Sequence, residues 1–326
     1  MNFSVLFPGQ GSQSPGMGKF LYDQFQRAKW VFEEASDAIQ INMAKLCFEG
    51  SESALALTEN TQPALVTVSS AFWKVLASET PLKPVSFAGH SVGEYSALVA
   101  ADSLSVTQAL KAVRLRGQSM QEAVPVGEGG MIALLGLDDA SVLDLCDRTR
   151  SEYLKQTGRK SVLSAANFNA PGQVVLSGHQ SCIDFLKTQI KTPLFPENLQ
   201  KAKLIPLNVS APFHCELMLP AEKIMGEFLE TIEIQEASAP VYQNVVAQPV
   251  RSGSELRSHL IQQVSRSVLW SASINKMISD GSSHFIECGS GKVLAGLGKK
   301  IRSEVPVLGA NSLEEFRALE KWISLR

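Results

Sequence analysis

The 326-residue sequence has little net charge and no long hydrophobic run. The formal net charge is −2, so the chain as a whole has no strong electrostatic attraction for nucleic acid or for an anionic membrane. No stretch reaches the roughly 18 consecutive apolar residues that a membrane-spanning helix needs. The first residues also lack the basic region and apolar core of a signal peptide. We therefore expect neither a nucleic-acid-binding protein nor a membrane protein.

Paired cysteine motifs are absent as well. The five cysteines are odd in number and scattered, and none stands in a C-x-x-C pair (Cys47, Cys146, Cys182, Cys215 and Cys288). This pattern argues against a disulfide framework or a zinc site and favours reduced thiols in a cytosol. With 44% hydrophobic and 19% charged residues, the composition is that of a globular protein with a sizeable core.

One stretch carries a recognisable chemical pattern. A short apolar run, Val85–Ala88, precedes Gly89-His90-Ser91-Val92-Gly93, which matches the G-x-S-x-G nucleophile elbow. Small and apolar residues suited to a helix follow. Strand, tight turn and helix are the setting that the elbow requires, and they place Ser91 at a helix N-terminus that favours a developing anion. The alternative is a serine that only caps the helix.

Three other features could complete a site around Ser91. The glycine-rich turn 8–13 follows the first strand and could bring backbone N–H groups close to a ligand, although it could also be an ordinary loop. A capping box at Ser105 opens a helix in which Arg116 lies about 70° from the centre of the apolar stripe. An arginine so placed needs an anionic partner, either a ligand or a structural salt bridge. His214 follows a strand end and a turn. This position suits a histidine that lines a cleft, but equally one that caps the next helix or lies in the core.

A small unit is predicted within the chain. After the glycine-rich joint 126–130, the pattern is β-α-β-β-α-β, which is typical of a ferredoxin-like unit. Its strands are expected at 131–135, 161–167, 173–177 and 203–209, and its helices at 138–150 and 180–191. We therefore predict a small domain at 128–207 inserted into a large α/β domain formed by 1–127 and 208–326. Elsewhere we expect helices at 18–40, at 64–78 with Pro63 in the first turn, and at 216–231.

The small unit has a locally basic sequence. Over residues 151–203, basic residues outnumber acidic ones by seven to three. Together with Lys292, Lys299 and Lys300, this excess predicts a surface for an acidic partner, with an ordinary solvated face as the alternative.

The ordered set of motifs resembles the malonyl-CoA:acyl carrier protein transacylase family. The matches run in the family order and cover residues 4 to about 310: Phe7–Gln13, Thr61–Ala64, Gly89–Glu94, Arg116-Gly117 with Met120, Asn167–Asn169 with Pro171–Val175, Ser210 with Pro212–His214, and Glu287–Gly289. The resemblance implies an α/β-hydrolase-like large domain with an inserted ferredoxin-like small domain.

The resemblance also implies roles for individual residues. Ser91 would be the nucleophile and His214 the general base, oriented by the main-chain carbonyl of Gln263. The backbone N–H groups of Gln10 and Val92 would form the oxyanion hole. Arg116 would bind the malonyl carboxylate.

The implied reaction moves malonyl from malonyl-CoA to the phosphopantetheine thiol of acyl carrier protein, in fatty acid biosynthesis. It needs no cofactor and no metal, and we expect a cytoplasmic monomer. Two departures from the family stand out. Arg266-Ser267-Val268 occupies a segment where the family often has Asn-Pro-Val, and this weakens the assignment of Gln263. The segments 151–160 and 191–202 are long for a compact small domain and predict extra loops.

Other functions remain open from the sequence. An esterase or thioesterase is one, but its usual Ser-Asp-His order would rely on His284 with Asp280 only four residues earlier, a poor triad spacing. An acyltransferase serving a polyketide synthase would have the same chemistry and differ in its carrier protein. A non-enzymatic binding module would need Ser91 or His214 to be unreactive.

Overall fold

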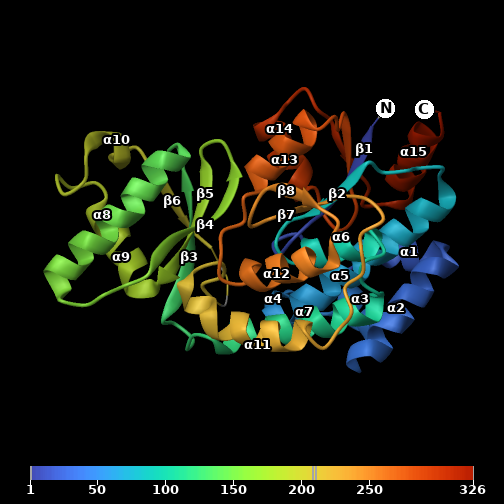
Figure 1. Ribbon diagram of the computed structural model, residues 1–326, viewed down its shortest axis with the longest axis horizontal. Helices are drawn as coiled ribbons and strands as arrows, with labels where there is room; N and C mark the ends of the chain where they lie inside the picture. The colour runs from blue at the N-terminus through green and yellow to red at the C-terminus, as the bar shows by residue number, and fades with distance from the viewer. Residues whose placement is uncertain (1, 208, 210, 326) are drawn as a thin grey trace.

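Two separate β-sheets organise the chain in the computed structural model, which describes residues 2–207, 209 and 211–325 (Figure 1). The larger sheet has the order β10-β9-β1-β2-β7-β8. Its strands are β1 (Phe3–Phe7), β2 (Ser86–Gly89), β7 (Val241–Gln243), β8 (Gln248–Val250), β9 (His284–Glu287) and β10 (Val307–Gly309). All neighbours pair in parallel except β8, which runs antiparallel to β7 at the edge.

Both faces of the larger sheet are buried, as expected of a parallel sheet. Along β1, Val5 and Phe7 enter one hydrophobic cluster and Leu6 enters another, because successive side chains point to opposite faces. The surrounding helices are α1 (Lys19–Gln24), α2 (Gln26–Ile39), α3 (Met43–Glu49), α4 (Glu52–Ala56), α5 (Thr58–Glu79), α6 (Gly93–Ala100), α7 (Val106–Glu122), α11 (Leu219–Leu229), α12 (Gly253–Gln263), α13 (Trp270–Ser279), α14 (Val293–Ile301) and α15 (Leu313–Ser324).

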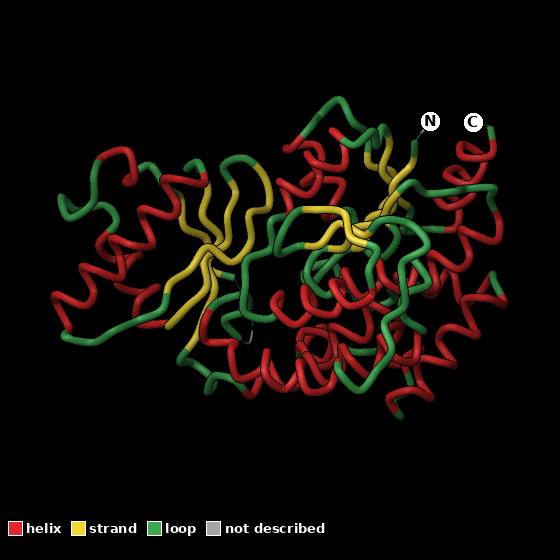
Figure 2. Tube along the Cα trace, in the orientation of Figure 1, coloured by secondary structure: helices red, strands yellow, loops and turns green. Residues whose placement is uncertain are grey.

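The smaller sheet is antiparallel, with the order β4-β5-β3-β6 (Figure 2). Its strands are β3 (Gly129–Leu135), β4 (Leu163–Ala170), β5 (Gln173–His179) and β6 (Lys203–Pro206), and its helices are α8 (Asp139–Thr157), α9 (Gln180–Gln189) and α10 (Glu197–Gln200). This order is that of a split β-α-β unit, and the sheet has a hydrophobic cluster of its own. The fold class expected from the sequence is therefore confirmed: an α/β-hydrolase-like domain with an inserted ferredoxin-like domain.

Several predicted boundaries need correction. Helix α5 begins at Thr58, so Pro63 lies inside it and not in its first turn. Proline has no N–H to donate to the carbonyl of Glu59, and Arg114 donates to that carbonyl instead, at 2.7 Å. The helix expected at 18–40 is broken by the extended backbone of Phe25. Helix α8 continues to Thr157, where Gly158 ends it in the left-handed conformation, so most of the predicted extra loop at 151–160 is helical.

Other differences are smaller. A 3₁₀ turn, Glu216–Met218, opens the segment expected to be one helix, and α10 occupies part of the second predicted loop. The strand expected at 241–246 stops at Gln243 and turns back into β8, which the sequence did not predict. The predicted capping box at Ser105 is confirmed. Asn208, in the strand expected at 203–209, and Ser210, in one family motif, lie outside the described residues.

Candidate active site

Ser91 lies in the predicted tight turn between β2 and α6. Its φ of 51° is in the left-handed region, which residues other than glycine rarely adopt. The turn is tight because the backbones nearly touch: a Cβ at Gly89 would lie 1.9 Å from the carbonyl carbon of Gly93, and one at Gly93 would lie 2.2 Å from the carbonyl oxygen of Phe7. The two glycines of the motif are therefore required by close approach, and the strand, turn and helix expected from the sequence are confirmed.

The structure brings His214 to Ser91 from 123 positions away in the chain. Ser91 Oγ lies 2.7 Å from His214 Nε2, and His214 Nδ1 lies 2.8 Å from the main-chain oxygen of Gln263. A carbonyl can only accept, so Nδ1 carries the proton and Nε2 is free to accept from the Ser91 hydroxyl. This is the arrangement of a serine nucleophile, a base and a group that orients the base, with a carbonyl in the third position.

The charge state of His214 follows from its surroundings. Burial and, after it, the nearby positive charge of Arg116 lower the pKa of His214 to about 3. The imidazole is therefore neutral near pH 7 and can take a proton.

Two backbone amides expected in the oxyanion hole remain available. In the part of the chain that the structure describes, the N–H groups of Gln10 and Val92 have no acceptor, and both residues line the cleft at Ser91. The amide of Ser91 itself is engaged, because it donates to Oδ1 of Asn244 at 2.8 Å.

Arg116 is almost fully buried, with 2% of its surface exposed. Its Nη1 donates to Oε1 of Gln62 at 2.7 Å, and its Nη2 donates to Oε1 of Gln263 at 2.9 Å and to Oγ of Ser91 at 3.3 Å. No carboxylate lies within ion-pair distance of it among the described residues. The salt bridge that the sequence left as an alternative is thus not formed, and a buried cation beside the serine is held by uncharged amides.

These groups line a cleft of about 350 Å³ between the two sheets. Arg116, Met120 and Phe213 lie on the side of the larger sheet, whereas Met131 and Asn167 come from the smaller one. The cleft can therefore hold a small acyl group with its carboxylate at Arg116 and its carbonyl at Ser91.

His90 bridges the two sheets beside Ser91. Its Nε2 lies 2.8 Å from Oδ1 of Asn169 on β4, and its ring packs edge-on against Trp270. The His90 side chain therefore contacts Asn169 and Trp270, whereas its neighbour Ser91 contacts His214.

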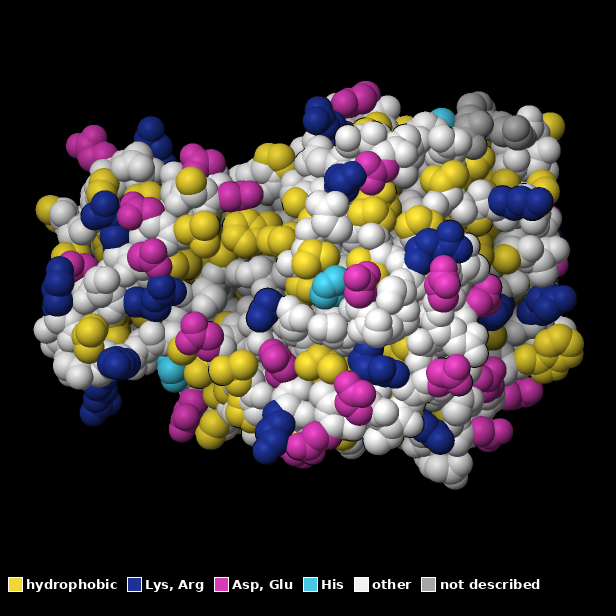
Figure 3. All heavy atoms as spheres, viewed as in Figure 1, with side chains coloured by type: hydrophobic (Ala, Val, Ile, Leu, Met, Phe, Trp, Pro, Cys, Tyr) yellow, Lys and Arg dark blue, Asp and Glu magenta, His cyan; other side chains and the backbone are white. Residues whose placement is uncertain are grey.

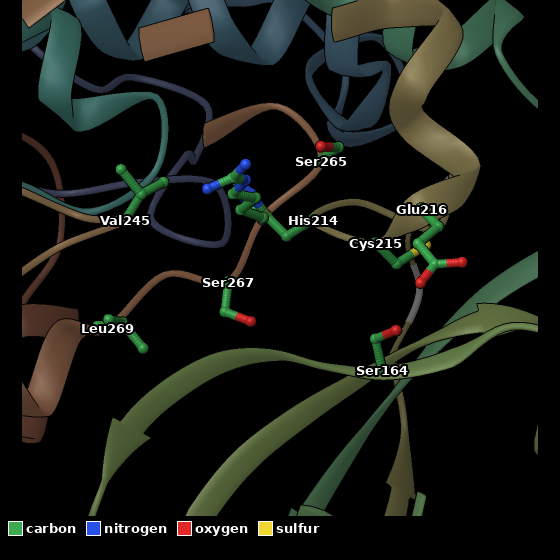
Figure 4. Close-up of a pocket in the computed structure, with 9 residues that line it drawn as sticks. Ser164, His214, Cys215, Glu216, Val245, Ser265, Ser267 and Leu269 are labelled. Atoms are coloured by element: carbon green, nitrogen blue, oxygen red, sulfur yellow. The ribbon is translucent and has the colours of Figure 1, made fainter. Parts of the chain in front are cut away.

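The loop that follows Gln263 lines a second cavity of about 430 Å³, and His214 lines this cavity as well (Figure 4). Ser267, in the segment where the family often has a proline, donates from Oγ to the main-chain oxygen of Ala165 on β4 at 2.6 Å. Val268 N–H donates to the carbonyl of Ala166 at 2.8 Å. Despite the departure from the family pattern, the loop is therefore anchored to β4, and the Gln263 carbonyl remains within hydrogen-bond distance of His214 Nδ1.

Sequence reasoning missed two amide side chains that organise this site. Gln62 holds Arg116, and the only sequence signal for it was its place in the Thr61–Ala64 motif. Asn244 holds the backbone at Ser91, and nothing in its local sequence pointed to it.

No group of three or more potential metal ligands occurs among the residues that the structure describes, and none of the helices there is long and apolar enough to cross a membrane.

Comparison with known proteins agrees with this geometry. The family described as acyl transferase domain matches residues 5–307. A malonyl CoA-acyl carrier protein transacylase from Bacillus subtilis (strain 168) is 42% identical over 311 residues, which are 95% of this chain and 94% of that protein. The structure of the malonyl CoA-acyl carrier protein transacylase from Coxiella burnetii superposes with a TM-score of 0.91 at 35% identity, covering 99% of this chain and 98% of the other.

A further solved structure is of a type II PKS acyl-carrier protein in complex with its malonyl-transacylase. It is similar with a TM-score of 0.89 at 35% identity, covering 98% of this chain and 99% of the other. The chain therefore belongs to the malonyl-CoA:acyl carrier protein transacylase family.

Proposed function

We propose that this protein transfers malonyl from malonyl-CoA to the phosphopantetheine thiol of acyl carrier protein, through a malonyl ester on Ser91. The observation that carries the proposal is a single arrangement. A serine bonded to a neutral, oriented histidine lies beside a buried guanidinium that lacks a carboxylate partner.

The first half-reaction loads the serine. Ser91 Oγ attacks the thioester carbonyl of malonyl-CoA while His214 Nε2 takes the hydroxyl proton. The resulting oxyanion accepts from the N–H groups of Gln10 and Val92, and each such donor is worth about 10²–10³-fold in rate. When the carbon–sulfur bond breaks, His214 returns the proton to the leaving CoA thiolate.

The second half-reaction reverses these roles. His214 takes the proton from the carrier protein's phosphopantetheine thiol, which attacks the Ser91 ester and forms the new thioester. The proton then returns to Ser91 Oγ. This sequence predicts ping-pong kinetics and needs no cofactor or metal. One chain supplies every group, so a monomer suffices.

Arg116 selects the acyl group in this proposal. A guanidinium binds a carboxylate with two parallel hydrogen bonds, and the malonyl carboxylate would replace the amide oxygens of Gln62 and Gln263. An acetyl group leaves the cation without an anionic partner.

The hydrolase alternative has a weaker basis. Asp280 accepts hydrogen bonds from the hydroxyl of Tyr242, at 2.5 Å, and from Nζ of Lys276, so its carboxylate is already engaged. Ser91 already has His214 as its base, and Arg116 has no use in a general esterase.

We also propose domain limits and a cellular setting. The large domain would comprise 1–127 and 208–326 and the small domain 128–207. These limits are supported by the start of β3 at Gly129 and the end of β6 at Pro206. All five cysteines are free and buried, which suits a reducing cytoplasm.

The basic residues suit an acidic carrier protein only in part. Lys155 pairs with Glu152, Lys187 with Asp184, and Lys292 with Glu315. Figure 3 shows basic and acidic side chains interspersed on the face in view. The basic residues that are left outside these ion pairs would steer the carrier protein without forming a single dominant patch.

Radiolabelled malonyl-CoA tests the proposal. We expect stoichiometric label on the protein, its transfer to carrier protein on addition, and no label on Ser91→Ala. Rapid release of free malonate in the absence of a thiol would instead support a hydrolase. One relative in this fold acts with a polyketide carrier protein, so carrier proteins of fatty acid and polyketide type should be compared as acceptors.

A further inference from the structure

Asn244 is joined to the turn that carries Ser91 by both ends of its carboxamide. Its Oδ1 accepts from the N–H of Ser91 at 2.8 Å, and its Nδ2 donates to the carbonyl of Gly89 at 2.7 Å. These two backbone groups lie on either side of His90. The carboxamide therefore bridges the turn that bears the nucleophile.

This bridge imitates a β-ladder. The pairing of β2 with β7 ends at Ala88 and Tyr242, just before β2 bends into the turn. In a parallel ladder, one residue's N–H and C=O bond to the groups on either side of the residue opposite. The Asn244 side chain makes this pair of bonds around His90, so it continues the ladder where the backbones separate.

The side chain is itself held from several directions. The N–H of Asn244 donates to Oε2 of the buried Glu94 at 2.8 Å, and its carbonyl accepts from the N–H of Leu269 at 2.9 Å. Gln263 Nε2 approaches its Oδ1 at 3.4 Å and donates to the carbonyl of Ser91 at 3.0 Å. Asn244 is fully buried, so it has little freedom to move away from the turn.

We propose that Asn244 is the positioning residue that keeps Ser91 in its reactive backbone conformation. A residue with φ of 51° costs free energy that the surroundings must offset. Without the carboxamide, the peptide between Gly89 and His90 loses the donor to its carbonyl, and the peptide between His90 and Ser91 loses the acceptor of its N–H. A rotation of that peptide displaces both Ser91 Oγ, which must face His214, and the following amide of Val92.

The proposal rests on the proposed function and deepens it. None of the Arg116 hydrogen bonds goes to Asn244, so we expect Asn244 to act on the loading of Ser91 and not on recognition of the acyl carboxylate. A displacement of about 1 Å at a reacting atom can cost on the order of 10²-fold in rate. We therefore expect the loss in kcat, with KM for malonyl-CoA nearly unchanged.

The experiment measures single-turnover malonylation of Ser91 by mass spectrometry of the full chain. For Asn244→Ala we expect a loss on the order of 10²-fold in the loading rate and a KM within threefold of wild type. The matched control is Gln243→Ala. Gln243 is the adjacent residue and is equally buried. Neither of its side-chain amide atoms has a hydrogen-bond partner among the residues that the structure describes. We expect the control to load at nearly the wild-type rate.

Asn244→Asp, which is close to isosteric, gives a second test that does not depend on tolerance of a cavity. At neutral pH its carboxylate can still accept from Ser91 N–H but repels the Gly89 carbonyl. Once protonated, it can donate to that carbonyl again. The charged and titratable groups around it are Glu94, which accepts from the Asn244 N–H, and His90, which lies between the two backbone groups that the side chain binds. His214 and Arg116 lie one residue further away, on Ser91 and Gln263. We expect the rate of the variant relative to wild type to rise as the pH falls from 8 to 5.

Three results would overturn the proposal: an Asn244→Ala loading rate within threefold of wild type, an equal loss in Gln243→Ala, or a large Asn244→Asp defect that does not change with pH. The proposed function fails separately, because it requires malonylation in the wild-type protein itself.

Discussion

Replacing Arg116 with alanine should abolish the preference for malonyl over acetyl without abolishing acyl transfer. Two of the guanidinium nitrogens, Nη1 and Nη2, now donate to the neutral amide oxygens of Gln62 and Gln263. Each of these bonds now has one ionised partner, and a malonyl carboxylate would make both partners ionised, which shortens and strengthens the bonds. Close charge pairs contribute about 1.5–7 kcal/mol in double-mutant cycles. We therefore expect the carboxylate to stabilise the malonyl complex by about 3 kcal/mol, or roughly 10²-fold.

The acetyl reaction should respond differently. Acetyl-CoA offers no anion, so in the wild-type protein it closes the cleft over an unpaired cation. Removing Arg116 removes this penalty, and the acetyl loading rate should stay within threefold or rise. The expected change in the malonyl-to-acetyl ratio is therefore on the order of 10²-fold or more.

The assay is single-turnover loading of Ser91 from each CoA ester, followed by mass spectrometry. Arg114→Ala is the matched control, because Arg114 lies on the same helix but pairs with Glu59 outside the cleft. That control should alter stability and leave the ratio unchanged. An Arg116→Ala protein that kept the wild-type preference would refute the carboxylate-binding role.

Three further outcomes are expected. Because the pKa of His214 is held near 3, kcat/KM for malonyl-CoA should stay level from pH 8 to 5, and a midpoint near pH 6.5 would contradict a buried neutral base. Burial raises the pKa of Glu287 from 4.5 to about 7, so ionising it costs the folded state up to about 3 kcal/mol as the pH rises through this range. Urea unfolding should show Glu287→Gln gaining stability relative to wild type between pH 4.5 and 8, and parallel pH curves would refute this. Transfer to carrier protein should slow as salt rises, whereas a rate independent of ionic strength would exclude steering by the basic excess.

The local parts of the site were predictable from the sequence. The elbow at Ser91 has its apolar strand, its two glycines and its helix within a dozen residues, and each element depends mainly on its neighbours. The helical period likewise placed Arg116 near a buried face. The β-α-β-β-α-β pattern predicted the smaller sheet for the same reason. Each of its strands and helices is indicated by its own local sequence, and these elements follow one another along the chain.

The contacts between distant segments were not predictable. Asn244 follows a three-residue strand and carries no local signal, and its importance arises only where β7 passes the elbow. Propensity also misplaced the start of α5, because a tertiary contact from Arg114 takes the carbonyl that Pro63 leaves without a donor. Both site residues that the sequence did not reveal, Gln62 and Asn244, act through side-chain amides. An amide can donate and accept hydrogen bonds, so its partners are decided only when distant segments come together in the folded site.

Recognition and base strength are coupled in this site because one charge acts on both. After burial, the positive charge of Arg116 is the largest cause that lowers the pKa of His214. A malonyl carboxylate bound at Arg116 cancels much of that charge, so the imidazole of the loaded complex accepts a proton more readily than that of the free protein. Acetyl leaves the charge in place. The acid limb of kcat should therefore lie at higher pH than that of kcat/KM for malonyl-CoA, and the two limbs should coincide for acetyl-CoA. The same guanidinium would then favour malonyl twice, once by holding the carboxylate and once by strengthening the base that activates Ser91.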